Sequence, residues 1–229
     1  MNAISTIVLF CALCLPVSGN ATPLDRWTIS CSVDKGAIKR KRGTYTFKTS
    51  TNGCENGSYN QRAEIKSEKV SSNITGIYLF ETNVAMKSKS KEKFDIFQIH
   101  DGRDSCAPPL KVQVAPNGTI RLQSGVKFGS GKQCEEEIRE TGRPNVTISR
   151  DGVEHNLRIL IQFKGRGEFS TDVWVDGKPA VSGAYSQPNF KGAFKSKTFY
   201  FKHGVYSKNK FDYKLISRGV DVKKIKASQ

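Results

Sequence analysis

The chain has 229 residues, enough for one large domain or two small ones, and its 37% hydrophobic and 10% aromatic residues can bury a core. A mostly disordered chain is therefore excluded. The 37 Lys and Arg exceed the 21 Asp and Glu, a formal net charge of +16 that favours a nucleic acid, an anionic membrane or an acidic polysaccharide as partner. The sequence has no phosphate-cradling Gly-rich loop and no paired CxxC, which disfavours classes that depend on a bound cofactor.

The N-terminal segment is typical of a secretory signal peptide, although it carries no Lys or Arg. Ile4 to Leu15 form an apolar run that small residues follow. The run is too short to span a bilayer, and no later stretch approaches about 20 apolar residues. We expect residues 1–19 to be removed, with cleavage after Ala21 as the alternative. Residues 20–229 would then form one secreted, soluble domain with no membrane partner.

Four of the six cysteines lie outside this segment, namely Cys31, Cys54, Cys106 and Cys134. In an oxidising compartment an even number suggests two disulfides, with three possible pairings. Among these we favour the local pairs Cys31–Cys54 and Cys106–Cys134. Metal binding by these cysteines is disfavoured, because their spacing is wide and no histidine pairs with them. Five N-x-S/T sequons indicate a eukaryotic secreted glycoprotein, although such sequons also arise by chance.

Alternating or β-branched runs predict strands along the whole chain. The predicted strands are Thr44–Thr49, Arg62–Ser67, Thr75–Met86, Lys93–His100, Leu110–Ala115, Thr119–Gln123, Asn145–Arg150, His155–Phe163, Glu168–Val175 and Thr198–Tyr206. Turn dipeptides stand between them, at Asn52-Gly53, Asn117-Gly118, Asp151-Gly152 and Asp176-Gly177. Helical periodicity occurs only around Glu135–Glu140. Closely spaced strands with hairpin turns predict an all-β antiparallel sandwich or jelly roll.

Polar side chains share one face in three of the predicted strands, namely Arg62–Ser67, Lys93–His100 and Thr198–Tyr206. Strand residues of equal parity point to the same face of the sheet. In the last segment Gly204 would tolerate a bulge or a close backbone approach. If the three strands are neighbours, the shared face suits an anionic sugar. The polar residues of equal parity are Arg62, Glu64 and Lys66 in the first segment, Gln98 and His100 in the second, and Tyr200, Lys202, Tyr206 and Lys208 in the third.

The same three segments resemble, in order, the motifs of polysaccharide lyase family 7, the alginate lyases. The family motifs are R-[ST]-E-L-R, Q-[IV]-H and Y-F-K-A-G-x-Y-x-Q, and this chain has R-A-E-I-K, Q-I-H and Y-F-K-H-G-V-Y-S-K. The segment Ala107 to Lys111 also resembles the family's next segment. Three residues depart from the pattern: Lys66 replaces an Arg, His203 an Ala and Lys208 a Gln. A Lys keeps the charge of the Arg but loses its bidentate fork.

The resemblance implies a concanavalin A-like jelly-roll β-sandwich with a concave groove that cleaves polyuronate by β-elimination. It assigns Gln98 and Arg62 to the substrate carboxylate, and His100 either to that carboxylate or to the C5 proton. Tyr206 would protonate the leaving oxygen and could also take the C5 proton, since Lys202 and Lys208 would favour tyrosinate. Neither metal nor organic cofactor is required. Further substrate contacts are implied for Lys202, Tyr200, Glu64, Lys66 and Lys208.

The leading hypothesis is a monomeric, endo-acting alginate lyase with an anionic polysaccharide as its partner. The resemblance associates the Ile of Q-I-H with tolerance for guluronate. The nearest alternative is a glucuronan lyase, which acts on a different uronate. A non-catalytic jelly-roll protein that binds acidic glycans fits the net charge but does not need Gln98, His100 and Tyr206 together. Nucleic-acid binding is the weakest alternative, because no recognised motif accompanies the charge.

Overall fold

A computed structural model describes residues 22–31, 33–50, 61–129, 134–135, 139–142 and 145–225. The predicted signal peptide, the Asn52-Gly53 turn and Cys54 lie outside these residues. The described part opens with a short 3-10 turn, η1 (Pro23–Asp25). Across the described ranges, no helix is long and apolar enough to cross a membrane.

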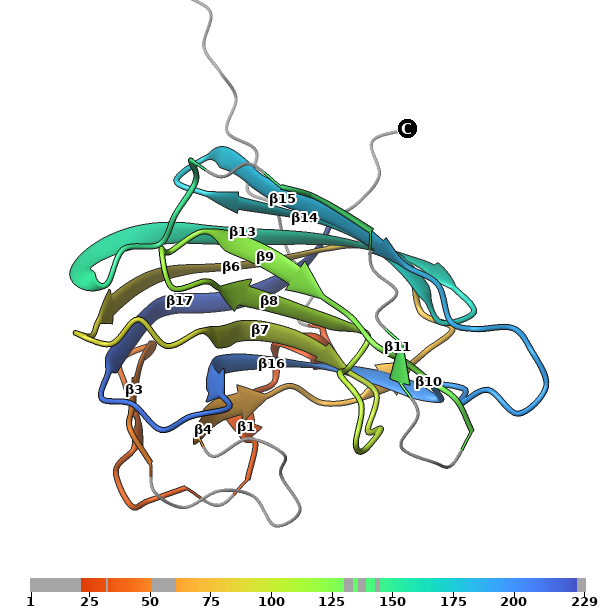
Figure 1. The fold of residues 1–229 in the computed structure, drawn as a ribbon, viewed down its shortest axis with the longest axis horizontal. Helices are drawn as coiled ribbons and strands as arrows, with labels where there is room; N and C mark the ends of the chain where they lie inside the picture. Colours follow the sequence, from red (N-terminus) through yellow and green to blue (C-terminus); the bar gives the residue numbers. More distant parts are fainter. Residues whose placement is uncertain are drawn as a thin grey trace, which may run out of the picture.

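One of the two large antiparallel sheets carries all three polar motifs, and we call it the groove sheet. Strands far apart in the chain become neighbours in it, as β7, β16 and β4 show in Figure 1. A short strand, β5 (Val70–Ser71), pairs with the start of β16. In spatial order the groove sheet contains β1 (Thr28–Ile29), β4 (Gln61–Lys66), β16 (Thr198–Ser207), β7 (Phe94–His100), β8 (Leu110–Val114) and β9 (Ile120–Gln123).

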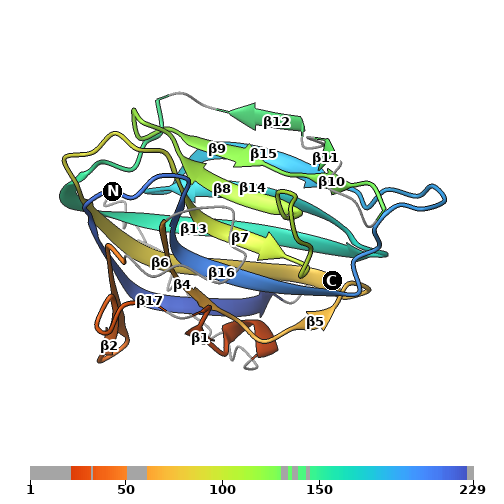
Figure 2. The same cartoon turned by 60° about the horizontal axis from the view of Figure 1, so that its bottom comes forward.

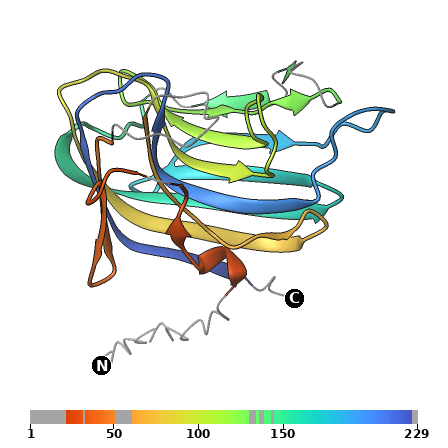
Figure 3. The same cartoon turned by 90° about the horizontal axis from the view of Figure 1, so that it is seen from below.

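The second large sheet, the outer sheet, stacks against the groove sheet, and the rotated views in Figures 2 and 3 show the two layers. A separate pair, β10 (Val126–Lys127) and β11 (Cys134–Glu135), lies beside the groove sheet. In spatial order the outer sheet contains β12 (Arg139–Gly142), β15 (Lys178–Tyr185), β14 (Glu168–Val175), β13 (Asp151–Gly165), β6 (Thr75–Lys87), β17 (Lys214–Ile225), β3 (Thr44–Lys48) and β2 (Ile38–Lys41).

The core lies between the two sheets because alternate residues of their strands are apolar. In β14 buried and half-buried residues alternate along all eight positions. Phe97 of the groove sheet packs on Phe80 of the outer sheet, with ring centres 4.7 Å apart, and on Phe201, at 5.1 Å. Burying one such side chain contributes roughly 1.5–3 kcal/mol, so the alternation fixes which face of each strand is left for the groove.

Nine of the ten predicted strands overlap an observed strand. The exception is Asn145–Arg150, which makes only an isolated bridge between Thr119 and Thr147. The Asp151-Gly152 turn is also wrong, since both residues lie inside β13, next to a register shift against β6. Strands β2, β15 and β17 were not predicted, because Lys, Gly and Ser interrupt their apolar pattern.

The predicted helical segment Glu135–Glu140 is wrong where the structure describes it. Cys134–Glu135 pairs with β10, and Arg139–Gly142 pairs with β15. A run of Glu residues favours a helix only slightly, by a few tenths of a kcal/mol per residue, and strand pairing overrides that preference here.

Candidate active site

A cavity of about 690 Å3 lies over the polar face of the groove sheet, and side chains from β4, β7, β8 and β16 form its floor. Seven of the nine predicted catalytic and substrate-contacting residues line it, so strand parity placed these seven on the face that forms one cavity. These seven are Arg62, Lys66, Gln98, His100, Tyr200, Lys202 and Tyr206.

Cross-strand pairing brings the three motifs together. Lys202 in β16 lies opposite Lys66 in β4 and opposite Gln98 in β7. Tyr206 lies opposite Arg62, and Tyr200 lies opposite His100 on the other neighbouring strand. Residues directly opposite one another in antiparallel strands point to the same side of the sheet, so β16 carries the centre of the site.

Gly204 explains the spacing of the third motif. Its φ is +140°, and a Cβ at this position would lie 2.2 Å from the carbonyl oxygen of Ala63, a distance that no larger residue could accept. The register between β16 and β7 shifts between His203 and Tyr206. The glycine therefore lets β16 approach β4 closely where Tyr206 enters the groove.

Tyr206 is 8% exposed and lies under two cations. The guanidinium carbon of Arg62 is 4.4 Å from its ring centre, and the Lys111 ammonium is 5.5 Å from it. Burial raises the pKa of Tyr206, while the charge of Arg62 and its hydrogen bond lower that pKa only in part. The expectation that Lys202 and Lys208 would favour tyrosinate is therefore wrong, and Tyr206 keeps its proton at neutral pH.

Glu64 is almost fully buried and does not line the groove, so its predicted substrate contact is wrong. The Gln98 side-chain amide donates to Glu64 Oε1 at 2.6 Å, and Arg62 Nε lies 3.6 Å from Glu64 Oε2. Burial raises the pKa of Glu64, while Lys202 and then Arg62 lower it. Glu64 orients Gln98, whose second N–H is left for a substrate.

His100 receives a hydrogen bond from the backbone rather than giving one. The N–H of Gly102 donates to His100 Nδ1 at 2.9 Å, and the His100 ring stacks on Tyr200 with centres 5.2 Å apart. Burial lowers the pKa of His100 well below 6.5, and the cations Lys202 and Arg62 lower it further. The imidazole is therefore neutral at neutral pH.

Lys202 is 5% exposed and lies on the groove floor. Burial lowers the pKa of Lys202 to about 8, with Arg62 and Lys66 acting in the same direction and Glu64 opposing them. The positive charge beneath the groove therefore depends on pH close to neutrality.

Two buried residues of the site escaped the sequence analysis. Lys111 in β8 lines the groove, and its ammonium lies 2.7 Å from Asp95 Oδ2. The side-chain amide of Gln113 donates to Asp95 Oδ1 at 2.6 Å. By parity Asp95 should face the core, but a register shift between Asp95 and Phe97 turns it to the groove side. Lys111 could have been found from the sequence, because it ends the Ala107–Lys111 segment that resembles a further segment of the family.

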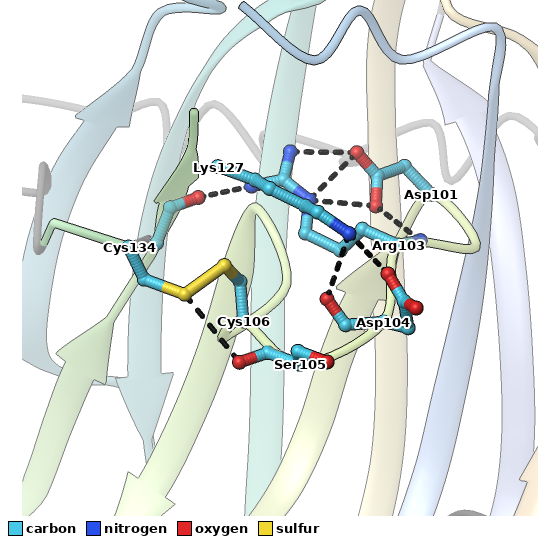
Figure 4. Close-up of a disulfide and its surroundings, with 8 residues drawn as sticks. Asp101, Arg103, Asp104, Ser105, Cys106, Lys127 and Cys134 are labelled. Atoms are coloured by element: carbon cyan, nitrogen blue, oxygen red, sulfur yellow. Dashed lines mark hydrogen bonds and ion pairs between the residues drawn. A yellow bond between two sulfur atoms is a disulfide. The ribbon is translucent and has the colours of Figure 1, made fainter. Parts of the chain in front are cut away.

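A disulfide-linked segment forms part of the groove lining, and Figure 4 shows the disulfide with the residues around it. Cys106 and Cys134 form the predicted disulfide, which ties the connection between β7 and β8 to β11. An ion pair between Lys127 and Asp104 holds the same connection against β10. Cys31 is also disulfide-bonded, and its pairing with Cys54 stays a prediction, since Cys54 lies outside the described residues.

Lys208 does not line the groove. Strand β16 ends at Ser207, so the parity that was extended to Lys208 no longer applies, and the side chain is exposed. Lys66, the other Lys that departs from the family motifs, does line the groove. Within the ranges that the structure describes, no group of three or more His, Cys, Asp or Glu side chains is arranged to hold a metal ion.

A two-layered antiparallel jelly roll with a cationic groove over one sheet, and Arg, Gln, His and Tyr side chains converging there, defines the class of jelly-roll polysaccharide lyases. The sequence profile of the family described as alginate lyase matches residues 13–228, and the chain belongs to this family. No curated protein matches the chain by sequence.

Solved structures show the same fold at low sequence identity. Alginate lyase AlgAT5 of polysaccharide lyase family 7 superposes with a TM-score of 0.56 at 13% identity, over 89% of this chain and 96% of that one. The alginate lyase of Klebsiella pneumoniae superposes with a TM-score of 0.54 at 16% identity, over 90% of this chain and 98% of that one. The endo-β-1,4-glucuronan lyase of Trichoderma reesei gives 0.53 at 11% identity, over 92% of each chain.

Proposed function

We propose that the protein is a lyase that cleaves alginate within the chain by β-elimination and leaves 4,5-unsaturated uronate ends. One observation carries the proposal: Tyr206, with a raised pKa, lies against Arg62 on the floor of a cationic groove, within the same cavity as Gln98 and His100. Membership of the alginate lyase family supports alginate over glucuronan as the polymer.

The reaction must remove a proton from C5, next to the substrate carboxylate. This proton is weakly acidic, and hydrogen bonds to the carboxylate let the developing negative charge spread onto it. Arg62 and the second amide N–H of Gln98 are suitable donors, and Glu64 holds both of them from below. The Lys202 ammonium adds positive charge under the same position.

Tyr206 supplies the proton that the leaving group needs. As the C4–O bond breaks, its electron pair stays on the glycosidic oxygen, which takes the Tyr206 proton, while C4 and C5 become doubly bonded. The raised pKa of Tyr206 keeps that proton in place at neutral pH. The neutral His100 donates to the carboxylate or takes the C5 proton, depending on which ring nitrogen carries hydrogen.

The site of action that we propose is outside the cell. The apolar run Ile4–Leu15 supports a cleaved signal peptide, and the Cys106–Cys134 disulfide supports an oxidising compartment. We extend the proposal to a monomeric glycoprotein that carries glycans on some of its five sequons.

The decisive experiment incubates the secreted protein with mannuronate-rich alginate, guluronate-rich alginate and glucuronan, each in a separate reaction. We expect ultraviolet absorbance from the conjugated double bond to rise on at least one alginate, and oligosaccharides of several lengths to form early, as internal cleavage requires. A rise on glucuronan alone would replace alginate by glucuronan. Binding without any absorbance change would leave the non-catalytic glycan-binding alternative.

A further inference from the structure

The turn that follows β7 determines which ring nitrogen of His100 carries the proton. Its residues are Asp101, Gly102 and Arg103, and we call it the 101–103 turn. Gly102 adopts a φ of +83° and directs its N–H at His100 Nδ1, 2.9 Å away. A non-glycine residue rarely adopts this backbone conformation, so the direction of the N–H is a feature of the glycine.

Asp101 and Arg103 lock the turn from inside the protein. Both are buried, at 6% and 4% exposure, and Asp101 accepts from Arg103 Nε at 2.9 Å and from Nη2 at 2.6 Å, as Figure 4 shows. Arg103 also donates to the Tyr185 hydroxyl at 2.8 Å and to the Gly125 carbonyl. The hydroxyl of Ser196 donates to Asp101 from a third segment.

These contacts hold the turn from three sides, because its ion pair is bonded to β15 and to the segments before β10 and β16. Breaking a buried ion pair by removing one partner is strongly unfavourable, and this pair holds Gly102 between its two members. The Gly102 N–H is therefore a fixed donor toward His100.

A fixed donor at Nδ1 decides where the imidazole carries its proton. A backbone N–H can only donate, so Nδ1 must accept, and the single proton of a neutral imidazole lies on Nε2. Burial and the cations Lys202, Arg62, Arg103 and Lys111 all lower the pKa of His100 and disfavour the doubly protonated ring. Since His100 lines the groove, it presents an N–H there and not a lone pair.

We propose that the 101–103 turn fixes His100 as an N–H donor to the substrate carboxylate, so that Tyr206 performs both proton transfers and the preferred residue is mannuronate. This inference rests on the proposed lyase function, and it departs from the guluronate tolerance that the Ile of Q-I-H suggested. Asp101 and Arg103 are positioning residues in it, since they act through Gly102 and do not touch the reacting atoms.

Tyr206 alone can perform both proton transfers of the β-elimination. Tyr206 is mostly protonated at neutral pH, so the step starts from its small ionised fraction. The phenolate takes the C5 proton, the C5–H electron pair becomes the C4=C5 double bond, and the C4–O pair leaves with the glycosidic oxygen. That oxygen receives the same proton from Tyr206, which regenerates the phenolate. One group can serve both atoms only when the C5 hydrogen and the C4 oxygen lie on the same face of the sugar. This holds for mannuronate and for glucuronate, whereas in guluronate they lie on opposite faces.

The first test reads the tautomer directly, without substrate, from 15N chemical shifts of the imidazole rings. The protein has three histidines, and two serve as internal references. His203 Nδ1 lies 2.9 Å from the Ile96 carbonyl, and His155 Nδ1 lies 2.7 Å from Asp176, so both carry hydrogen on Nδ1. We expect His100 alone to show hydrogen on Nε2. An Nδ1-protonated His100 would overturn the proposal whatever the enzyme cleaves.

The second test measures kcat/KM on mannuronate-rich and guluronate-rich polymers from pH 6 to 10. We expect guluronate to be slower by about a hundredfold, because one acid–base group is missing for it. The rate on mannuronate should climb between pH 7 and pH 8, as the ionised fraction of Tyr206 grows. Arg62 and Lys111 lower the pKa of Tyr206, whereas burial and Glu64 raise it, and above pH 8 the loss of the Lys202 charge opposes the climb. The variant His100→Gln keeps an N–H donor and should lose about tenfold on mannuronate. A faster reaction on guluronate, or a rate that is flat above pH 6.5, would identify His100 as the base.

The third test loosens the turn. Arg103→Lys loses the planar fork, and we expect the His100 pKa to rise toward 6.5 and an Nδ1-protonated fraction to appear. Tyr185→Phe removes a single bond to Arg103, and should give a smaller shift if Arg103→Lys does not fold. Arg158→Lys, an exposed change on the outer sheet, is the matched control. Folded turn variants with unchanged histidine spectra would remove Asp101 and Arg103 from the inference.

The two proposals fail in different ways. If His100 shows hydrogen on Nε2 and no polyuronate gives an absorbance rise, the lyase function is wrong and the tautomer assignment stands. If absorbance rises on glucuronan as well as on mannuronate but not on guluronate, the inference about the sugar configuration is supported for both polymers.

Discussion

The two faces of the groove sheet use the same residue types for opposite purposes. Strand β16 turns Tyr200, Lys202 and Tyr206 to the groove, and Phe201 and His203 to the core. Burial lowers the pKa of the histidine on each face, since that of His203 falls to about 4 and that of His100 falls well below 6.5. The His100 and His203 rings differ in their hydrogen-bonding partners.

His203 is satisfied on both sides by the protein. Its Nδ1 donates to the Ile96 carbonyl at 2.9 Å, and its Nε2 accepts from the Ser217 hydroxyl of the outer sheet at 2.8 Å. His100 has a protein partner at Nδ1 and turns its other edge to the groove. A buried histidine is structural when both nitrogens are bonded within the fold, and is available for chemistry when one faces a cavity.

A substitution of Tyr206, on the groove face, should have the largest effect on the rate of polymer cleavage. Tyr206→Phe removes only a hydroxyl, and we expect the rate of absorbance increase to fall about a thousandfold because the leaving oxygen loses its proton donor. Binding of polymer, measured by sedimentation or calorimetry, should change by less than about threefold, since no charge is lost.

Tyr200→Phe is the matched control for this change. Tyr200 lines the same groove and stacks on His100, but it has no assigned proton transfer, so its rate should fall by less than about tenfold. Equal losses in the two variants would mean that the Tyr206 hydroxyl has no special role.

Changing the core face at His203 should alter stability and not the chemical step. Its folded-state pKa of about 4 lies below the unfolded value of 6.5, so the unfolded chain binds more protons between these pH values. The His203 contribution is fully present above pH 6.5 and is lost as the pH falls toward 4, by roughly 3 kcal/mol.

His203→Leu should remove this part of the pH dependence. Urea unfolding at pH 7 and pH 4.5 would measure it, and the comparison is between slopes, because the variant also leaves Ser217 and the Ile96 carbonyl without their ring partner. A variant whose free energy of unfolding falls as steeply as that of the wild type would show that His203 does not titrate as the burial implies.

The sequence predicted the groove face well where strands are regular and failed where they are not. Parity placed Arg62, Gln98 and Lys202 correctly, because β4, β7 and β16 pair in register around them. It misplaced Asp95, since a bulge is not visible in alternation, and Lys208, since it lies one residue beyond the strand.

The 101–103 turn could not have been predicted at all. Its function depends on Gly125, Tyr185 and Ser196, which lie 22 to 95 residues away from their partners in the chain. Local propensity identifies Gly102 as part of a turn, but only the tertiary structure shows that its N–H faces a ring nitrogen. Long-range polar contacts of this kind are the part of a site that pattern analysis misses.

Lys202→Gln should have a smaller effect than Tyr206→Phe or His203→Leu, and the effect should be on KM. The ammonium is charged below a pKa of about 8, so its attraction for the uronate carboxylate is present at pH 7 and fades as the pH rises past 8. We expect KM to rise about tenfold at pH 7, and the difference between wild type and variant to shrink by pH 9. A constant difference across this range would exclude titration of Lys202.

Lys208→Gln should have the smallest effect, and it tests the border of the site. The substitution restores the residue that the family motif has at this position, and removes the same charge as Lys202→Gln. Lys208 is exposed and follows the last residue of β16, outside the groove lining. Exposed charges are screened within about 10 Å at ordinary salt, so KM at pH 7 should change by less than about twofold. A KM increase close to that of Lys202→Gln would place a bound polymer over the end of β16 and extend the groove beyond the residues that line it now.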